Sequence, residues 1–126
     1  MSDQIFCTLF DSNYLDKGIV LYQSMVEHLE PDFRLYVFAF DDIAERILKN
    51  ENYSNMTVVS LHDFETAELL KVKSERSRAE YCWTCTAWTI KYVIENYGEQ
   101  VCTYIDADMM FFGNPQIVFD QMRKEL

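Results

Sequence analysis

The chain has 126 residues, which fits one domain with a modest core, and 49% of them are hydrophobic, as in folded proteins. Its formal net charge of −10 gives a surface that repels phosphate backbones, so we expect no nucleic-acid partner. No apolar run approaches the roughly 20 residues of a transmembrane helix, and the N-terminal segment lacks the regions of a secretion signal, so we expect a cytoplasmic protein.

Apolar runs that suit strands alternate with segments of helical spacing. Strands are predicted at residues 4–10, 33–40, 56–61 and 100–105, with a short fifth strand in the MMFF run at 109–112. Helices are predicted at residues 14–29, 42–50, 63–70, 77–97 and 116–124. Asp41 and Asp42 are the expected caps of the second helix, and Gly98 is the expected end of the long one.

This alternation predicts an α/β fold in a single domain over residues 1–126. The predicted strands are apolar almost throughout, which is typical of a mostly parallel sheet of about four strands with helices on both faces. In such sheets, ligands bind beyond the carboxyl ends of the strands, where the strand order reverses. The loops at 11–14 and 106–108, after the first and fourth predicted strands, are therefore the candidate site.

The fourth predicted strand leads into YIDADMMFF, where Asp106 and Asp108 are one residue apart. The spacing alone is weak in a chain with ten aspartates, and a solvated turn is the alternative interpretation. An extended backbone would send both carboxylates to one side, where their repulsion calls for a cation. Hard oxygen ligands suit Mg²⁺ or Mn²⁺, with water and phosphate oxygens completing the coordination. We therefore expect a metal–diphosphate site.

The loop FDSNYL places Asp11, Asn13 and Tyr14 where the first helix begins. A helix N-terminus favours anions, and the Tyr14 ring is suited to stack on a base. Plain capping of the helix by Asp11, Ser12 or Asn13 is the alternative and needs no ligand. The glycine patterns of a dinucleotide fold and of a P-loop are both absent from the sequence.

The segment KVKSERSR, residues 71–78, holds four of the eleven basic residues. The segment fits a solvated charged loop that leads into the long helix, and a mobile basic loop that clamps a diphosphate is the alternative interpretation.

Four cysteines occur, and two of them form the C-x-x-C motif CWTC at Cys82 and Cys85. The motif falls inside a helical pattern, and Cys7 and Cys102 lie in predicted strands, so we expect structural thiols that behave as small hydrophobes. A redox or zinc site is the alternative.

The stretches TLFDSNYLDKGIVLYQSM and YIDADMMFF together resemble glycosyltransferases of the GT-A fold. They look most like the galactosyltransferase and glycogenin-like group and related bacterial sugar-nucleotide transferases. The resemblance implies that Asp106 and Asp108 bind Mn²⁺ or Mg²⁺ on the diphosphate of a nucleoside-diphosphate sugar, UDP-linked in our prediction. The nucleotide-binding residues that it implies are Thr8, Asp11, Asn13, Tyr14, Arg78 and Asp106. The activity that it implies is transfer of a hexose to an acceptor hydroxyl.

Catalytic domains of that group are longer than this chain, and their later segments supply the acceptor pocket and a metal-binding histidine. Neither His28 nor His62 occupies such a position, and the sequence identifies no catalytic residue and no acceptor. The chain therefore resembles the Rossmann-like, nucleotide-sugar-binding half of a GT-A domain, apparently truncated. The alternative is a non-catalytic interaction domain that forms a homodimer through an uncovered sheet surface.

Overall fold

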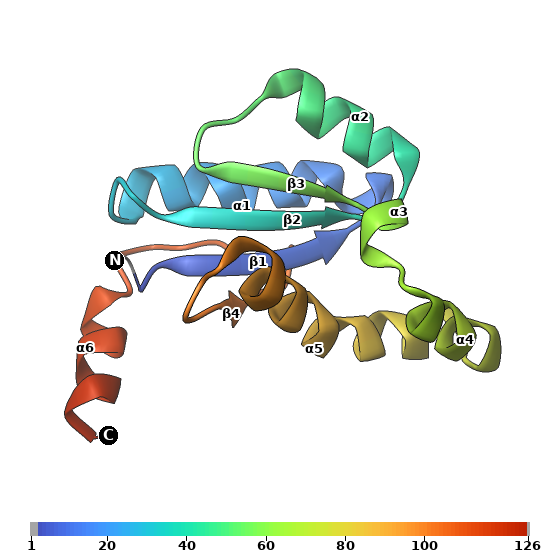
Figure 1. The fold of residues 1–126 in the computed structure, drawn as a ribbon. Coiled ribbons are helices and arrows are strands. Elements are labelled where there is room, and N and C mark those ends of the chain that lie inside the picture. The colour runs from blue at the N-terminus through green and yellow to red at the C-terminus, as the bar shows by residue number, and fades with distance from the viewer. Residues whose placement is uncertain (1–2, 126) are drawn as a thin grey trace.

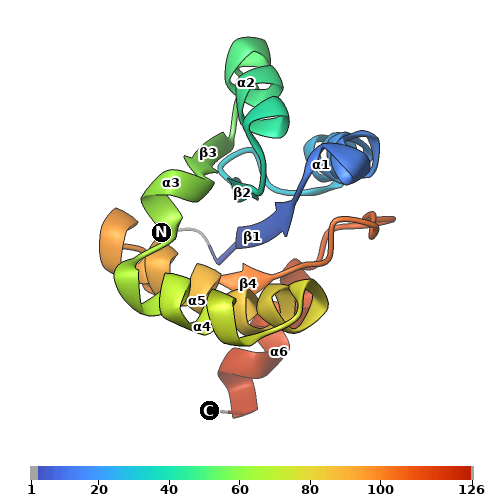
Figure 2. The same cartoon turned by 90° about the vertical axis from the view of Figure 1, so that its right-hand side faces the viewer.

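The structure, a computed structural model, describes residues 3–125 but not the side chains of Arg78 and Cys82. In this part of the chain, four parallel strands form one sheet in the order β3-β2-β1-β4, with helices on both faces (Figures 1 and 2). The strands are β1 (Ile5–Phe10), β2 (Arg34–Ala39), β3 (Met56–Ser60) and β4 (Thr103–Tyr104). The α-helices are α1 (Leu15–His28), α2 (Asp42–Glu51), α3 (Leu61–Phe64), α4 (Ala67–Glu75), α5 (Arg78–Tyr97) and α6 (Gln116–Glu125).

The predicted fold class is confirmed, because the chain forms a four-stranded, all-parallel sheet between helices, as in Rossmann-like folds. The strand order runs outward from β1 through β2 to β3 and then returns to place β4 on the other side of β1. The order therefore reverses between β1 and β4, which is the point where open parallel sheets bind their ligands.

Side chains of β1 alternate between two hydrophobic cores, one on each face of the sheet. Phe6 and Phe10 face α1 and α2, whereas Ile5 and Cys7 face α3, α4 and α5. The two views in Figures 1 and 2 show the same division of the helices. With both faces covered, β1 is buried over most of its length, which explains why its sequence is apolar almost throughout.

Helix α1 passes very close to β1 at Gly18. A Cβ atom built on Gly18 would lie 2.4 Å from the ring of Phe10, which is itself buried. Any side chain at this position would displace the ring or the helix. Gly18 therefore sets the distance between β1 and α1, and with it the position of the loop that connects them.

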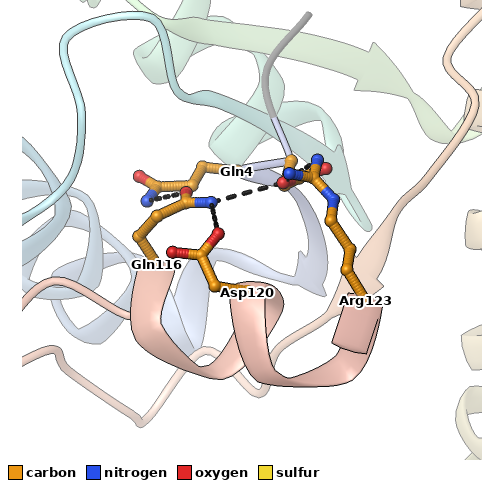
Figure 3. Close-up of polar contacts among 5 residues, drawn as sticks. Gln4, Gln116, Asp120 and Arg123 are labelled. Carbon is orange, nitrogen blue, oxygen red and sulfur yellow. Dashed lines mark hydrogen bonds and ion pairs between the residues drawn. The ribbon is translucent and has the colours of Figure 1, made fainter. Parts of the chain in front are cut away.

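Helix α6 packs Phe119 against Phe6 of β1. Polar side chains also attach it to the rest of the protein, as Figure 3 shows. The buried Gln4 donates from Nε2 to Gln116 Oε1 at 2.9 Å. Gln116 in turn donates to Asp120 Oδ1 at 3.1 Å and to Asp3 Oδ2 at 3.3 Å, and Arg123 forms an ion pair with Asp3. The helix therefore turns a polar side toward the N-terminal end of β1.

Two predictions about the helical segments are wrong. The segment 63–70 contains two helices rather than one, because Thr66 accepts from the Leu69 N–H and caps a new helix, α4. The predicted basic loop at 71–78 is mostly helical, since α4 continues to Glu75 and α5 begins at Arg78. Lys73 pairs with Glu65 at 2.9 Å within this folded region.

The predictions for the C-terminal strands are also corrected. Strand β4 covers only two residues rather than 100–105, and it pairs along one side only, with β1. The MMFF run at 109–112 is a loop rather than a fifth strand. In this loop the Phe111 N–H donates to Ser24 Oγ at 2.9 Å, so a side chain of α1 takes the place of a strand partner.

Substitution of Gly18 by alanine is expected to destabilise the fold. The close approach of Phe10 makes overpacking cost about 1–3 kcal/mol, which exceeds the helix-propensity gain of about 1 kcal/mol for alanine over glycine. Urea denaturation should show a lower free energy of unfolding for Gly18→Ala. Gly113→Ala is the matched control, because a Cβ there meets no atom within 4 Å, and it should leave stability nearly unchanged. An equal stability for the two variants would contradict the packing argument.

Candidate functional site

A cleft of about 600 Å³ opens beyond the carboxyl ends of β1 and β4. Its lining comprises Leu9, Asp11, Tyr14, Phe40, Ala79, Tyr104, Asp106, Ala107 and Asp108. The two loops predicted from the sequence as the candidate site thus meet in one cleft, at the reversal of strand order. Among the described side chains, three carboxylates, one exposed aromatic ring and several apolar groups surround it.

The two aspartates of the D-x-D motif lie in a turn rather than on the extended backbone that we predicted. The Met109 N–H donates to the Asp106 carbonyl at 3.1 Å and closes the turn. Ala107 between them is buried against the α1 face of the sheet, and Asp106 and Asp108 are exposed on either side of it. Both aspartates line the cleft, so the turn brings them together by a different backbone path from the one expected.

The loop after β1 forms a single 3₁₀ turn, Ser12–Tyr14, with Asp11 as its N-cap. The Asn13 N–H donates to Asp11 Oδ1 at 2.9 Å, and the Tyr14 N–H donates to the Asp11 carbonyl at 3.1 Å. The Ser12 N–H donates to Asp41 Oδ2 at 2.9 Å. These three amides therefore already donate to protein oxygens, so the anion preference of a helix N-terminus is largely satisfied within the protein.

Two of the residues implied by the resemblance, Thr8 and Asn13, do not line the cleft in the structure. Thr8 is fully buried in β1, and no hydrogen-bond partner is found for its Oγ1 among the described residues. Asn13 is exposed and is not among the residues that line the cleft. The side chain of Arg78 lies outside the described part of the chain, although Ala79 places the first turn of α5 at the cleft.

Lys17 and Tyr104 are site residues that the sequence did not single out. Lys17 Nζ lies 4.9 Å from the centre of the Tyr14 ring, in a cation–π contact. Lys17 also lines a smaller adjoining cleft of about 160 Å³ together with Asp108, so it is a cation beside an acidic site. The sequence could have indicated this contact, because Lys17 follows Tyr14 by three residues and residues three apart on a helix are neighbours.

Tyr104 forms part of the cleft wall, next to the acidic turn. Burial, and then the negative charge of Asp106, raises the pKa of Tyr104 to about 12. The phenol is therefore neutral at physiological pH and contributes an aromatic surface and a hydroxyl rather than a charge.

The described side chains offer no ready-made metal cage. Within the part of the chain that the structure describes, His, Cys, Asp and Glu do not gather in groups of three or more suited to a metal ion. Two carboxylates are nevertheless a fitting anchor for Mg²⁺ or Mn²⁺, because such ions keep several water or phosphate ligands. The C-x-x-C motif lies inside α5, where the Cys85 side chain is buried, and the side chain of Cys82 is not described.

Comparison with known proteins places the chain beside longer relatives. No family model matches it. It is 33% identical over 120 residues to the uncharacterized protein YfnD of Bacillus subtilis (strain 168), and 28% identical over 116 residues to the uncharacterized protein YfnF of the same organism. These matches cover 94% and 91% of the chain but 38% of each relative. None of the helices in residues 3–125 combines the length and apolarity that crossing a bilayer requires.

Stability at alkaline pH tests the environment of Tyr104. The pKa of the phenol rises from 10.0 to about 12 on folding, so its contribution is complete below pH 10 and is lost as the pH rises toward 12. The free energy of unfolding should fall over this interval and should fall less steeply in Tyr104→Phe. Urea denaturation at several pH values would measure both slopes, and equal slopes would contradict the assignment.

Proposed function

We propose that the chain binds a nucleoside-diphosphate sugar through a divalent metal, as the donor-binding half of a GT-A-like glycosyltransferase. The reaction would transfer a hexose from a UDP-sugar to an acceptor hydroxyl. The observation that carries this proposal is the single cleft at the β1/β4 reversal, where Asp11 and Tyr14 face the D-x-D turn. Its volume of about 600 Å³ falls in the range typical of small-molecule sites.

Asp106 and Asp108 are the residues that would hold Mn²⁺ or Mg²⁺. Both are exposed, both line the cleft, and their carboxylates are hard ligands that leave other coordination positions to water and phosphate oxygens. When bound, such an ion would neutralise the charge that develops on a departing diphosphate. Lys17, which lies beside Asp108 at the adjoining cleft, supplies a further positive charge at this side of the site.

The nucleoside would lie along the aromatic and apolar part of the cleft. The Tyr14 side chain is 48% exposed, which leaves ring surface for stacking on a base. Leu9, Phe40 and Tyr104 supply the apolar walls, and Asp11 offers a carboxylate to ribose hydroxyls. These groups bind and orient a donor, and the chain offers no assigned catalytic base, so we expect little transfer by this chain alone.

Calorimetry with UDP and Mn²⁺ tests the metal–diphosphate site. Wild-type protein should bind UDP only when Mn²⁺ is present. Asp108→Asn should weaken binding by at least about tenfold, because replacing a residue that merely hydrogen-bonds to a metal ligand already lowers metal affinity by about that factor. Asp32→Asn, at an exposed aspartate before β2, is a control with the same change of charge and should bind as wild type does. Equal affinities of wild type and Asp108→Asn would overturn the proposal.

A second candidate function, an interaction domain that self-associates, is favoured by one feature of α6. This helix turns its polar residues toward Gln4 and Asp3, while Ile117, Val118 and Met122 on its other side are 77%, 57% and 54% exposed. A surface helix normally turns its whole apolar stripe toward the core, whereas α6 turns Phe119 toward it together with polar residues. Exposed apolar surface of this kind is typical of association sites.

Light scattering distinguishes this second candidate. If α6 joins two copies, wild-type protein should scatter as a dimer and Ile117→Glu should shift it to a monomer, because a charge in an apolar interface is costly to desolvate. Ile43→Glu makes the same change at an isoleucine of α2 that is 48% exposed, and it should remain dimeric. A monomeric wild type at all accessible concentrations would exclude this candidate.

A further inference from the structure

One carboxylate at the end of β2 joins the site loop to the second helix. Asp41 Oδ2 accepts two hydrogen bonds from Ser12, one from its backbone N–H at 2.9 Å and one from its hydroxyl at 2.7 Å. The other oxygen, Oδ1, accepts from the Ala44 N–H at 2.8 Å as the N-cap of α2. Asp41 therefore connects three segments: the turn after β1, the end of β2 and the start of α2.

The turn that Asp41 holds is too short to be stable by itself. It has three residues, and the hydrogen bonds from the Asn13 and Tyr14 N–H groups both end on Asp11, inside the same loop. An isolated turn of this length gains too few hydrogen bonds to offset the entropy of ordering it. The bonds from Ser12 to Asp41 reach across 29 positions of the chain and fix the turn against the sheet.

We propose that Asp41 is a positioning residue of the cleft, which holds the Ser12 turn so that Asp11 and Tyr14 face the D-x-D turn. Asp41 does not line the cleft, whereas its neighbour Phe40 does. That a nucleotide occupies the cleft is taken from the proposed function, and this part of the inference rests on it. Its structural part, the anchoring of the turn by the Asp41 carboxylate, stands independently.

The need for a carboxylate follows from the way in which three described donors divide between its two oxygens. Two donors from Ser12 converge on one oxygen, and a third, from Ala44, meets the other. An asparagine has one acceptor oxygen, so it can satisfy either the cap of α2 or the two Ser12 donors, but not both. Hydrogen bonds to a charged acceptor are also stronger than those to a neutral one, so Asp41→Asn weakens the anchor on both counts.

Amide hydrogen exchange, measured by NMR without ligand, tests the anchoring. In Asp41→Asn, protection of the Ser12 amide should fall at least about tenfold, because a hydrogen bond to a charged group is lost. Asparagine is itself a good N-cap, so α2 should keep its protection and the free energy of unfolding should change little. Asp42→Asn, at the neighbouring exposed aspartate, should exchange as wild type does. Wild-type protection of both the Ser12 and the Ala44 amides in Asp41→Asn would overturn the inference.

Calorimetry with UDP and Mn²⁺ then tests the consequence for the cleft. Asp41→Asn should weaken UDP binding about tenfold with little loss of global stability, a separation that a purely structural role would not produce. Wild-type affinity in a variant that has lost Ser12 protection would overturn the positioning role. If wild-type protein binds no UDP, the proposed function fails, and the exchange results alone decide whether Asp41 anchors the turn.

Discussion

Two residue pairs join β1 to β4, Phe6 with Thr103 and Cys7 with Tyr104, and the Ile105 N–H adds one hydrogen bond to the Cys7 carbonyl at 2.9 Å. Parallel pairing brings the carboxyl ends of both strands to the same edge of the sheet. Because the strand order reverses at this pair, the following loops leave on either side and a cleft remains between them. The nearness of the first loop to the D-x-D turn therefore depends on this short pairing.

Acidic side chains line the cleft, and contacts outside it hold their backbones in place. Ala107 is buried between Asp106 and Asp108, and the loop that follows is tied to α1 through Ser24. On the other side, the carboxylate of Asp41 accepts the Ser12 donors and so fixes the loop that carries Asp11. Carboxylates that line one cleft are suited to ligate a hard cation together. This shared lining supports the metal–diphosphate proposal.

The two surfaces of α6 support a different kind of binding. The helix contacts the rest of the protein through Gln116, Phe119 and Arg123, while the apolar residues on its other side are exposed. Both curated relatives are longer proteins, of which the chain spans 38%. The cleft and the exposed apolar side of α6 occupy different parts of the molecule, so the two candidate functions are compatible and are tested by different variants.

The sequence alone determined the α/β class, the strands β1 to β3, and the helices α1, α2 and α5, because apolar spacing and local caps such as Asp41 and Gly98 act over a few residues. It also indicated both loops of the cleft, since polar residues after a buried strand mark its carboxyl end. Only the tertiary structure decided the length of β4, the loop at 109–112, the turn at the D-x-D motif and the Asp41–Ser12 anchor. The same apolar run is compatible with a strand that pairs with another strand and with a loop whose N–H donates to a side chain such as Ser24. Which of these partners is present depends on contacts between residues far apart in the chain.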